Sequence, residues 1–257
     1  MAIIASSFLI KKAAELILNA QSVVALTGAG SSTPSGIPDF RSKGSGLWTR
    51  YSQMEVASLS AFRQNPERFF EWFRPFAQNI LTAKPNATHF ALAKLEQTHL
   101  LDTIITQNIA NLHQRAGSEK VLQVHGTLSS LTCIGCYQNV PGKKFQVSYI
   151  STGKIPFCQN CGNILKPDVV LFEEQLPAKI WLKARRATQT CDLMVVLGTS
   201  LVVSPVAQLP EQAKKNGAKI IIINKTATYM DKYADVVIHG DTAEVLPKII
   251  EKLGVRN

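Results

Sequence analysis

The sequence has no apolar run long enough to cross a membrane, although 46% of its 257 residues are hydrophobic. A membrane-spanning helix needs about 20 mostly apolar residues. The apolar segment 1–10 has no basic residues before it and is followed by Lys11 and Lys12, so it indicates the start of an amphipathic helix rather than a signal peptide. We therefore expect an intracellular, cytoplasmic protein that does not contact a membrane.

Acidic residues are few, with 18 Asp and Glu against 28 Lys and Arg, which gives a net charge of +10. The basic residues are scattered along the chain and form no long run. This pattern favours a solvated basic surface that suits an acidic cofactor, and it predicts no specific nucleic-acid site. The sequence gives no sign of an oligomer, and we favour a monomer.

Cysteines are also few, and four of the five form two pairs, Cys133 with Cys136 and Cys158 with Cys161. In an intracellular chain such pairs favour a metal over disulfides. Four thiolates fill the tetrahedral coordination of zinc and leave no position for water, so the predicted zinc is structural. Basic and aromatic residues are not interleaved around the pairs, which disfavours a nucleic-acid-binding ribbon. Cys191 begins an apolar run and is expected to be a small buried hydrophobe.

Apolar runs alternate with amphipathic segments through most of the chain, which predicts an α/β fold with a Rossmann-like parallel sheet. A short β-like run is expected at 168–172, and the segment after Cys133 has little helical signal. Strands are predicted at 23–26, 101–106, 121–124, 193–197, 220–223 and 236–238, and helices at 7–20, 87–97, 178–189, 206–216 and 242–253.

Two segments interrupt this alternation: an aromatic-rich helical stretch at 43–83 and the cysteine-containing stretch at 127–166. We expect them to form a smaller domain, with a helical insertion and a zinc-ribbon insertion. The discontinuous sheet domain would then consist of 1–42, 84–126 and 167–257.

A glycine-containing loop follows the first predicted strand. Gly28 and Gly30 stand where small residues let a phosphate approach the backbone. The dinucleotide motif Gly-x-Gly-x-x-Gly is incomplete, because position 33 is Thr33, and no acidic residue ends an obvious second strand. An ordinary dehydrogenase is therefore disfavoured.

Polar side chains follow the next two strands. Gln107 and Asn108 come at the carboxyl end of one strand, and His125 comes at the end of the other, where ligands bind in open parallel sheets. An imidazole titrates near neutral pH and can act as a general base. From its position alone, a hydrogen-bonded structural role for His125 is the favoured alternative. His113 is expected to be structural.

Taken together, these motifs resemble the sirtuin family. The resemblance covers roughly 25–245 and implies removal of acyl groups from protein lysines with NAD, releasing nicotinamide and O-acyl-ADP-ribose. The matching motifs are Gly36–Arg41, Thr106–Ile109, Val124–Gly126, the two Cys-x-x-Cys pairs, Gly198–Ser200 and Ile223–Asn224.

The resemblance also implies roles for individual residues. His125 would deprotonate a ribose hydroxyl, and Asn108 would hold the ribose and position water. Val170, Phe172 and Val203 would line the site of an acetyl-lysine protein or peptide, whose extended backbone would pair with 168–173. The residues implied to bind NAD are Gly28, Ala29, Gly30, Thr33, Asp39, Phe40, Arg41, Gln107, Asn108, Ile109, Gly198, Thr199, Ser200, Asn224, Lys225, Asp241 and Thr242.

The sequence departs from the family pattern in three respects. Phe73 and Phe76 stand where members that remove acidic acyl groups carry Tyr-x-x-Arg, which favours an acetyl or longer neutral acyl group. Glu173 replaces a glycine. Ala110 replaces an aspartate that engages the nicotinamide carboxamide in the family, which predicts slower turnover. Two alternatives stay open: mono-ADP-ribosyl transfer, and a catalytically weakened module that binds NAD or acylated peptides.

Overall fold

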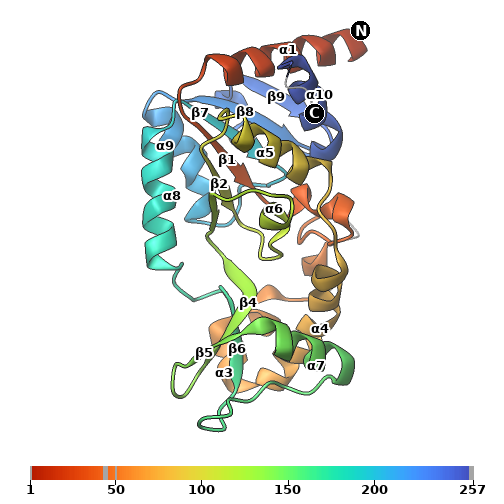
Figure 1. The fold of residues 1–257 in the computed structure, drawn as a ribbon, viewed down its shortest axis with the longest axis vertical. Helices are drawn as coiled ribbons and strands as arrows, with labels where there is room; N and C mark the ends of the chain where they lie inside the picture. The colour runs from red at the N-terminus through yellow and green to blue at the C-terminus, as the bar shows by residue number, and fades with distance from the viewer. Residues whose placement is uncertain (1, 43–45, 50, 255–257) are drawn as a thin grey trace.

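A computed structural model describes residues 2–42, 46–49 and 51–254 of the chain. Positions 43–45 and 50 of the predicted helical insertion therefore lie outside the described residues, as do residue 1 and residues 255–257. The described chain contains a six-stranded sheet and a three-stranded sheet, which lie at opposite ends of the molecule (Figure 1). None of the helices in these ranges is both long and apolar enough to cross a membrane.

The larger sheet is wholly parallel, with the order β3-β2-β1-β7-β8-β9. Its central strands are apolar on both faces, because helices cover both sides of the sheet. The Rossmann-like parallel sheet predicted from the alternation is therefore confirmed. The strands are β1 (Val23–Thr27), β2 (Thr103–Thr106), β3 (Val121–Gln123), β7 (Leu193–Leu197), β8 (Lys219–Asn224) and β9 (Val236–His239).

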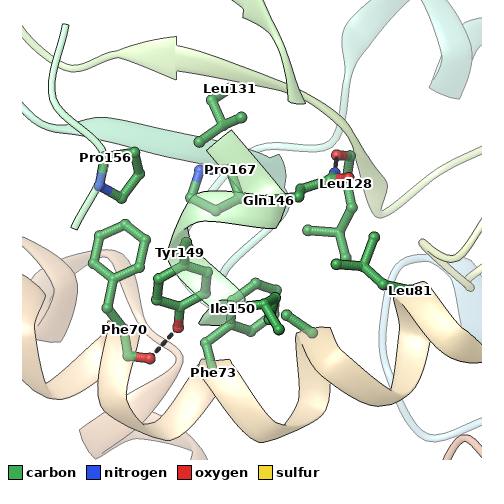
Figure 2. A pocket seen from close by; sticks show the side chains of 11 residues that line it. Phe70, Phe73, Leu81, Leu128, Leu131, Gln146, Tyr149, Ile150, Pro156 and Pro167 are labelled. Carbon is green, nitrogen blue, oxygen red and sulfur yellow. Dashed lines mark hydrogen bonds between the residues drawn. The ribbon is translucent and has the colours of Figure 1, made fainter. Parts of the chain in front are cut away.

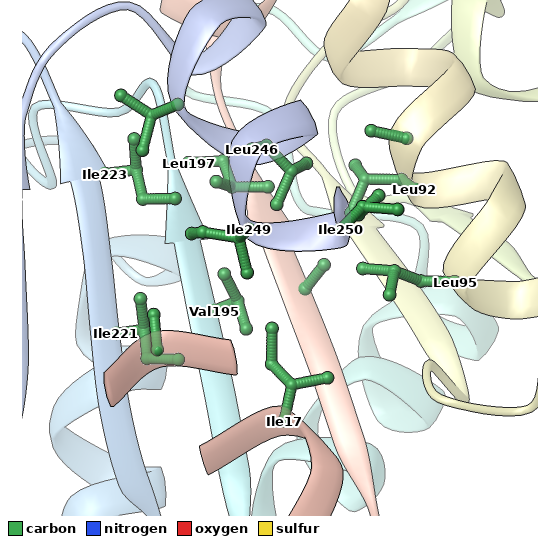
Figure 3. Packing of buried hydrophobic residues seen from close by; sticks show 14 of the residues in the cluster. Ile17, Leu92, Leu95, Val195, Leu197, Ile221, Ile223, Leu246, Ile249 and Ile250 are labelled. Atoms are coloured by element: carbon green, nitrogen blue, oxygen red, sulfur yellow. The ribbon is translucent and has the colours of Figure 1, made fainter. Parts of the chain in front are cut away.

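Three helices cover one face of this sheet: α1 (Ala2–Asn19), α5 (Ala87–Gln97) and α10 (Thr242–Lys252). Figure 3 shows Ile17, Leu92 and Leu246 from these helices packed over side chains of β7 and β8. Alternate residues of each strand point to this face, which is the period-two pattern of a strand. Burial of these side chains contributes the main apolar stabilisation of this layer.

The opposite face packs against α8 (Ala178–Thr190) and α9 (Leu209–Lys215). Ala184 of α8 and Ala213 of α9 contact it through small side chains, and both are fully buried. Cys191 is also buried in this cluster, as its position before an apolar strand predicts.

The predicted helical insertion forms three helices, α2 (Gln53–Val56), α3 (Leu59–Gln64) and α4 (Pro66–Thr82). Their aromatic side chains, with Phe62, Phe69, Phe70 and Phe73 all buried, form most of a separate core that residues of β4, β6 and α7 complete. The predicted helical character of this segment is confirmed over its described residues.

The smaller sheet has the order β5-β4-β6 and is antiparallel. It consists of β4 (Gly126–Cys133), β5 (Asn139–Pro141) and β6 (Leu165–Val169). The β-like run expected at 168–172 therefore begins and ends three residues too late, and β6 pairs with β4 instead of joining the larger sheet. The predicted domain boundary between 166 and 167 lies inside β6.

A helix within the cysteine-containing segment was not predicted. Helix α7 (Gly142–Thr152) packs on α4, with the ring of Tyr149 edge-on to that of Phe70 at a centroid distance of 5.3 Å. Figure 2 shows the small apolar pocket between them and the Tyr149 hydroxyl, which donates to the backbone oxygen of Phe70. The local sequence has little helical signal, so contacts with α4 rather than propensity account for this helix.

Candidate functional site

The predicted site residues lie at the carboxyl ends of the parallel strands. Gly28 follows β1, Gln107 follows β2 and Gly198 follows β7, while His125 lies two residues beyond the end of β3. In open parallel sheets ligands bind at this edge. The strand order places β1 between β2 and β7, so the loops that carry these residues are neighbours.

The glycines of the first loop serve a close contact between two loops. The N–H groups of Gly28 and Gly30 donate to the oxygens of Leu197 and Gly198, at 3.0 and 2.8 Å. A Cβ atom on Gly28 would lie 2.6 Å from Thr199 Cβ, and one on Gly30 would lie 2.9 Å from Gly198 O. Both N–H groups are thus already used. In this structure the two glycines let the loops after β1 and β7 touch, and their role in binding a phosphate stays a prediction.

Asn108 joins the loop after β2 to the loop after β1. Its side-chain nitrogen donates to Gly28 O at 2.9 Å and contacts the hydroxyls of Ser31 and Ser32 at 3.2 and 3.1 Å. No described residue hydrogen-bonds its Oδ1 atom. The side chain is therefore fixed through its nitrogen and presents its carbonyl oxygen for a ligand. The neighbouring Gln107 donates to Thr199 Oγ1 at 3.0 Å.

The imidazole of His125 has a defined orientation. Its Nδ1 atom lies 3.3 Å from the backbone oxygen of Gln107, and a carbonyl can only accept, so Nδ1 carries the proton. Burial, with a smaller effect from the charge of Arg41, lowers the pKa of His125 from 6.5 to about 4, although the hydrogen bond to Gln107 O acts in the opposite direction. At neutral pH His125 is therefore uncharged, with a lone pair on Nε2 that can take a proton.

A buried polar network beneath Asn108 was not predicted from the sequence. His89 and His113 are fully or almost fully buried, with ring centroids 4.8 Å apart. His89 Nε2 lies 3.5 Å from Ser32 Oγ, which contacts Asn108. His113 Nε2 lies 3.0 Å from Thr27 Oγ1.

The network closes back on Asn108 through the strand ends. Thr27 Oγ1 donates to Thr106 Oγ1 at 2.8 Å, and Thr106 Oγ1 accepts from the backbone N–H of Asn108 at 3.1 Å. The structural role expected for His113 fits this burial. His89 stands out in the sequence only as the third residue of a helix capped by Asn86, a signal that did not distinguish it.

Asp39 stabilises the end of the loop that follows β1. Its carboxylate accepts from the backbone N–H groups of Arg41 and Ser42, at 2.9 and 2.7 Å. No carboxylate in the described part of the chain lies within ion-pairing distance of Arg41, and partial burial lowers the pKa of its guanidinium. A guanidinium left open in this way at this edge suits a ligand with phosphates.

Phe40 and Phe172 both contact Trp48. Phe40 stacks on Trp48 with centroids 5.2 Å apart, and Phe172 meets Trp48 edge-on at 6.1 Å. The same Phe40 ring lies 5.6 Å from that of Phe76. Phe40, predicted to bind NAD, and Phe172, predicted to line the acyl-lysine site, therefore share one aromatic neighbour.

The loops after β8 and β9 form the other end of the site. Lys225 Nζ lies 2.8 Å from Asp241 Oδ2, and the hydrogen bond to Asp241 raises the pKa of Lys225. Asp241 also caps α10, and Thr242 Oγ1 accepts from Thr88. Asn224 donates to Thr226 O at 2.7 Å.

The remaining predicted ligand residues are spread along the same loops. Thr33 Oγ1 donates to Gly30 O at 3.0 Å, Ala29 begins a short 3-10 turn, and Ile109 O accepts from Leu128 N at 3.4 Å. Ser200 follows Thr199 in the loop after β7.

Most hydrogen-bonding groups of the predicted substrate strand are already used. Val170 N donates to His125 O, and Phe172 N and O pair with Ala57 and Leu59, each at 2.9 Å. Within 168–173, the Val170 carbonyl and the backbone groups of Glu173 form no backbone hydrogen bond with a described residue and stay open for a peptide. No hydrogen bond among the described residues joins Val203 to this strand.

The departures from the family pattern at Phe73, Phe76 and Ala110 lie in an apolar setting. Phe73, Phe76 and Ala110 are all buried in the aromatic core of the helical insertion, with Phe40 packed against it. A charged acyl group would lose hydration among these apolar side chains.

The four paired cysteines converge at the far end of the smaller sheet. Their Sγ atoms all lie within 4.8 Å of one another, with Cys133 to Cys161 at 3.4 Å and Cys136 to Cys158 at 3.7 Å. Four thiolates around one zinc ion at 2.3 Å would be about 3.8 Å apart. No disulfide links them. This donor set fits a closed, structural zinc site.

Comparisons with known proteins agree with this geometry. The model of the Sir2 family matches residues 28–205, which is more than half of the chain. An NAD-dependent protein deacylase 2 of Archaeoglobus fulgidus is 46% identical over 245 residues, covering 95% of this chain and 96% of that protein. An NAD-dependent protein deacetylase of Sulfolobus acidocaldarius is 41% identical and covers 95% and 94%.

Solved structures show the same likeness in three dimensions. One described as "Structural Basis for the Mechanism and Regulation of Sir2 Enzymes" superposes with a TM-score of 0.90 at 44% identity, covering 95% of this chain and 97% of that one. Another, "Sir2-p53 peptide-NAD+", has a TM-score of 0.88 at 36% identity and covers 96% and 99%. This chain therefore belongs to the Sir2 family.

Proposed function

We propose that the protein removes acetyl or other neutral acyl groups from lysine side chains of proteins, using NAD and releasing nicotinamide and O-acyl-ADP-ribose. The observation that carries the proposal is the neutral, oriented His125 at the edge of the sheet where Asn108 presents its carbonyl oxygen. Relatives named as NAD-dependent deacylases and deacetylases support it.

The donor groups at this edge fit NAD. Arg41, which forms no ion pair with any described residue, suits the diphosphate, the Lys225–Asp241 pair offers polar groups at the adenosine end, and Phe40 offers an aromatic face. When bound, NAD supplies the sugar carbon that exchanges nicotinamide for the acyl oxygen. The individual binding roles of these residues are part of the proposal.

The chain's own contribution is to orient groups and to accept a proton. His125 donates its Nδ1 proton to Gln107 O, so Nε2 is free to deprotonate a ribose hydroxyl. Asn108, fixed by Gly28 and the two serines, holds the ribose and a water molecule through Oδ1. The apolar wall around Phe76 excludes water from the acyl side.

The apolar setting of Phe73 and Phe76 supports a neutral acyl group as substrate. An acidic acyl group would need a cation, and the phenylalanines at these two positions cannot supply one. A cytoplasmic location, a monomeric state and the absence of a specific nucleic-acid partner remain predictions from the sequence. So does the division into a discontinuous sheet domain and a small domain.

One assay tests the proposal. An acetyl-lysine peptide is incubated with and without NAD, and free nicotinamide and deacetylated peptide are measured together. Equal amounts of both products support deacylation. Nicotinamide without deacetylated peptide, together with labelled ADP-ribose on protein, would support mono-ADP-ribosyl transfer instead. Binding of NAD or peptide with neither product would leave the protein a binding module.

A further inference from the structure

The segment that follows β6 makes a turn at an unusual residue. Glu173 has a φ of 72°, in the left-handed region that favours glycine, and Glu174 N donates to Leu171 O at 3.1 Å to close the turn. A glycine would adopt this conformation without strain. Glu173 must therefore be retained in this conformation by contacts of its own.

Those contacts reach across to the helical insertion. The carboxylate of Glu173 accepts from the backbone N–H of Ser60 at 2.9 Å and from its hydroxyl at 3.1 Å. Ser60 lies in the first turn of α3, where N–H groups have no partner within the helix. The hydrogen bonds from Ser60 also lower the pKa of Glu173, so the carboxylate is ionised at neutral pH.

Backbone pairing strengthens the same connection. Leu59 N donates to Phe172 O and Phe172 N donates to Ala57 O, both at 2.9 Å. Glu174 closes the other side, because its carboxylate accepts from Leu171 N at 2.8 Å and lies 2.9 Å from Lys166 Nζ. The turn is thus tied on one edge to the start of α3 and on the other to β6.

The tied segment leads directly to the catalytic region. Val170 N donates to the oxygen of His125 at 2.9 Å, and the Phe172 ring contacts Trp48. Within this stretch of the described chain, the backbone groups that form no backbone hydrogen bond include those of Glu173 and the carbonyl of Val170. Glu173 therefore lies where a substrate backbone would find open hydrogen-bonding groups.

We propose that Glu173 is a positioning residue that ties the peptide-binding turn 170–174 to α3 and so preforms the edge that an acyl-lysine peptide pairs with. This inference rests on the proposed deacylase function. The tie acts on the peptide and not on NAD, because its contacts lie on the acyl side of Trp48. The contact also requires a side chain at position 173 that is long enough to reach Ser60.

Two substitutions distinguish the effect of the Glu173–Ser60 contact from the effect of backbone strain at position 173. Glu173→Gly relieves the strain but removes both contacts with Ser60, whereas Glu173→Gln keeps an acceptor of the same reach. Glu251→Gln, on the exposed end of α10, is the matched control for loss of a surface carboxylate. Each variant is assayed for deacylation with peptide and NAD varied separately, and peptide binding is measured by fluorescence anisotropy.

We expect Glu173→Gly to raise the KM and Kd for the acetyl-lysine peptide by about 3- to 10-fold, the effect of losing one or two exposed hydrogen bonds. The KM for NAD and kcat should change by less than about twofold, because Glu173 contributes to peptide binding equally in the ground state and in the transition state. Glu173→Gln should recover most of the peptide affinity. Hydrogen exchange at the Ser60 amide should become faster in Glu173→Gly alone.

Unchanged peptide affinity in Glu173→Gly would overturn the proposal. So would an equal rise of both KM values together with a lower melting temperature, because that pattern indicates a general loss of stability. If the wild-type protein deacylates the peptide and Glu173→Gly binds it equally well, only this inference is contradicted. A wild-type protein that neither binds nor deacylates the peptide contradicts the proposed function, and this inference fails with it.

Discussion

The Nδ1 atom of His125 lies 3.3 Å from the backbone oxygen of Gln107, and this contact fixes which imidazole nitrogen is basic. Because the carbonyl accepts the Nδ1 proton, the free lone pair is on Nε2. Burial keeps the ring neutral, with a pKa lowered to about 4. His125 is therefore ready to accept a proton throughout the physiological pH range.

This finding gives a prediction for the pH dependence of deacylation. The active form of His125 is the neutral one, so activity is lost only as pH falls through its folded pKa. We expect the acidic limb of kcat/KM near pH 4 instead of near the ordinary histidine value of 6.5. His125→Gln should lower kcat by about 100- to 10,000-fold. A limb near 6.5, with the protein still folded by circular dichroism, would contradict this prediction.

The amide of Asn108 gives a second prediction. Asn108→Asp keeps the size of the side chain but places a carboxylate oxygen 2.9 Å from Gly28 O, where a donor now lies. Losing this bond and creating a repulsion costs about 1 to 3 kcal/mol, so kcat/KM should fall by about 5- to 150-fold. Asn216→Asp, at the exposed carboxyl-terminal cap of α9, is the control, because its side chain forms no hydrogen bond with a described residue. Equal activity of both variants would refute the role of the amide nitrogen.

Much of the fold was predictable because the parallel sheet leaves a strong pattern. Continuous apolar runs such as Val23–Leu26 and Leu193–Leu197 occur where strands are covered on both faces. Helix α7 and the exact position of β6 were not predictable, since both depend on contacts with α4 and β4 that local sequence does not encode.

The candidate site shows the same division. The polar residues at strand ends were identified from their position, but their partners were not. The pairing of His89 with His113 joins residues 24 positions apart in the chain. The contact of Trp48 with Phe172 joins the helical insertion to the segment that follows β6. Such pairings are set by how the elements pack, so a single sequence without structure could not supply them.

The cysteine cluster gives a third prediction. Purified protein should contain one zinc ion per chain, and a strong chelator should lower its melting temperature, because the four thiolates otherwise repel or oxidise. Cys133→Ala, at a buried ligand, should remove the zinc. Cys191→Ala, at a buried thiol outside the cluster, should retain it. Equal zinc content in the two variants, measured by atomic emission, would contradict the assignment.

The buried histidines give a fourth prediction, for stability against pH. Burial lowers the pKa of His89 to about 4 and that of His113 to about 3, below the value of 6.5 for an exposed ring. Between these values the unfolded chain binds protons that the folded chain does not, so the free energy of unfolding rises with pH up to about 6.5 and then levels. Urea unfolding at pH 5 and pH 7 measures this difference.

His89→Asn should reduce the difference between pH 5 and pH 7, because one of the buried rings is gone. His99→Asn removes an exposed histidine and keeps a residue that tolerates its φ of 59°, so it should leave the difference nearly unchanged. If both variants keep the wild-type difference, other groups cause the acid sensitivity.

Ala110 gives the last prediction. It is buried in the apolar cluster against which Phe40 packs, at a position where the family resemblance calls for an aspartate that engages the nicotinamide carboxamide. Ala110→Asp restores that acceptor, and a hydrogen bond to a charged group contributes about 1.5 to 3 kcal/mol, so nicotinamide release should become about 10- to 150-fold faster. Ala110→Asn is the matched control, because it adds similar volume without the charge.

The same substitution should cost stability, since a carboxylate placed in this apolar cluster loses hydration when NAD is absent. We therefore expect Ala110→Asp to melt at a lower temperature than wild type without NAD and to recover part of the loss when NAD is added. Faster nicotinamide release in the aspartate variant but not in the asparagine variant would show that charge, and not volume, was missing at this position. Unchanged release in both would mean that Ala110 does not limit turnover.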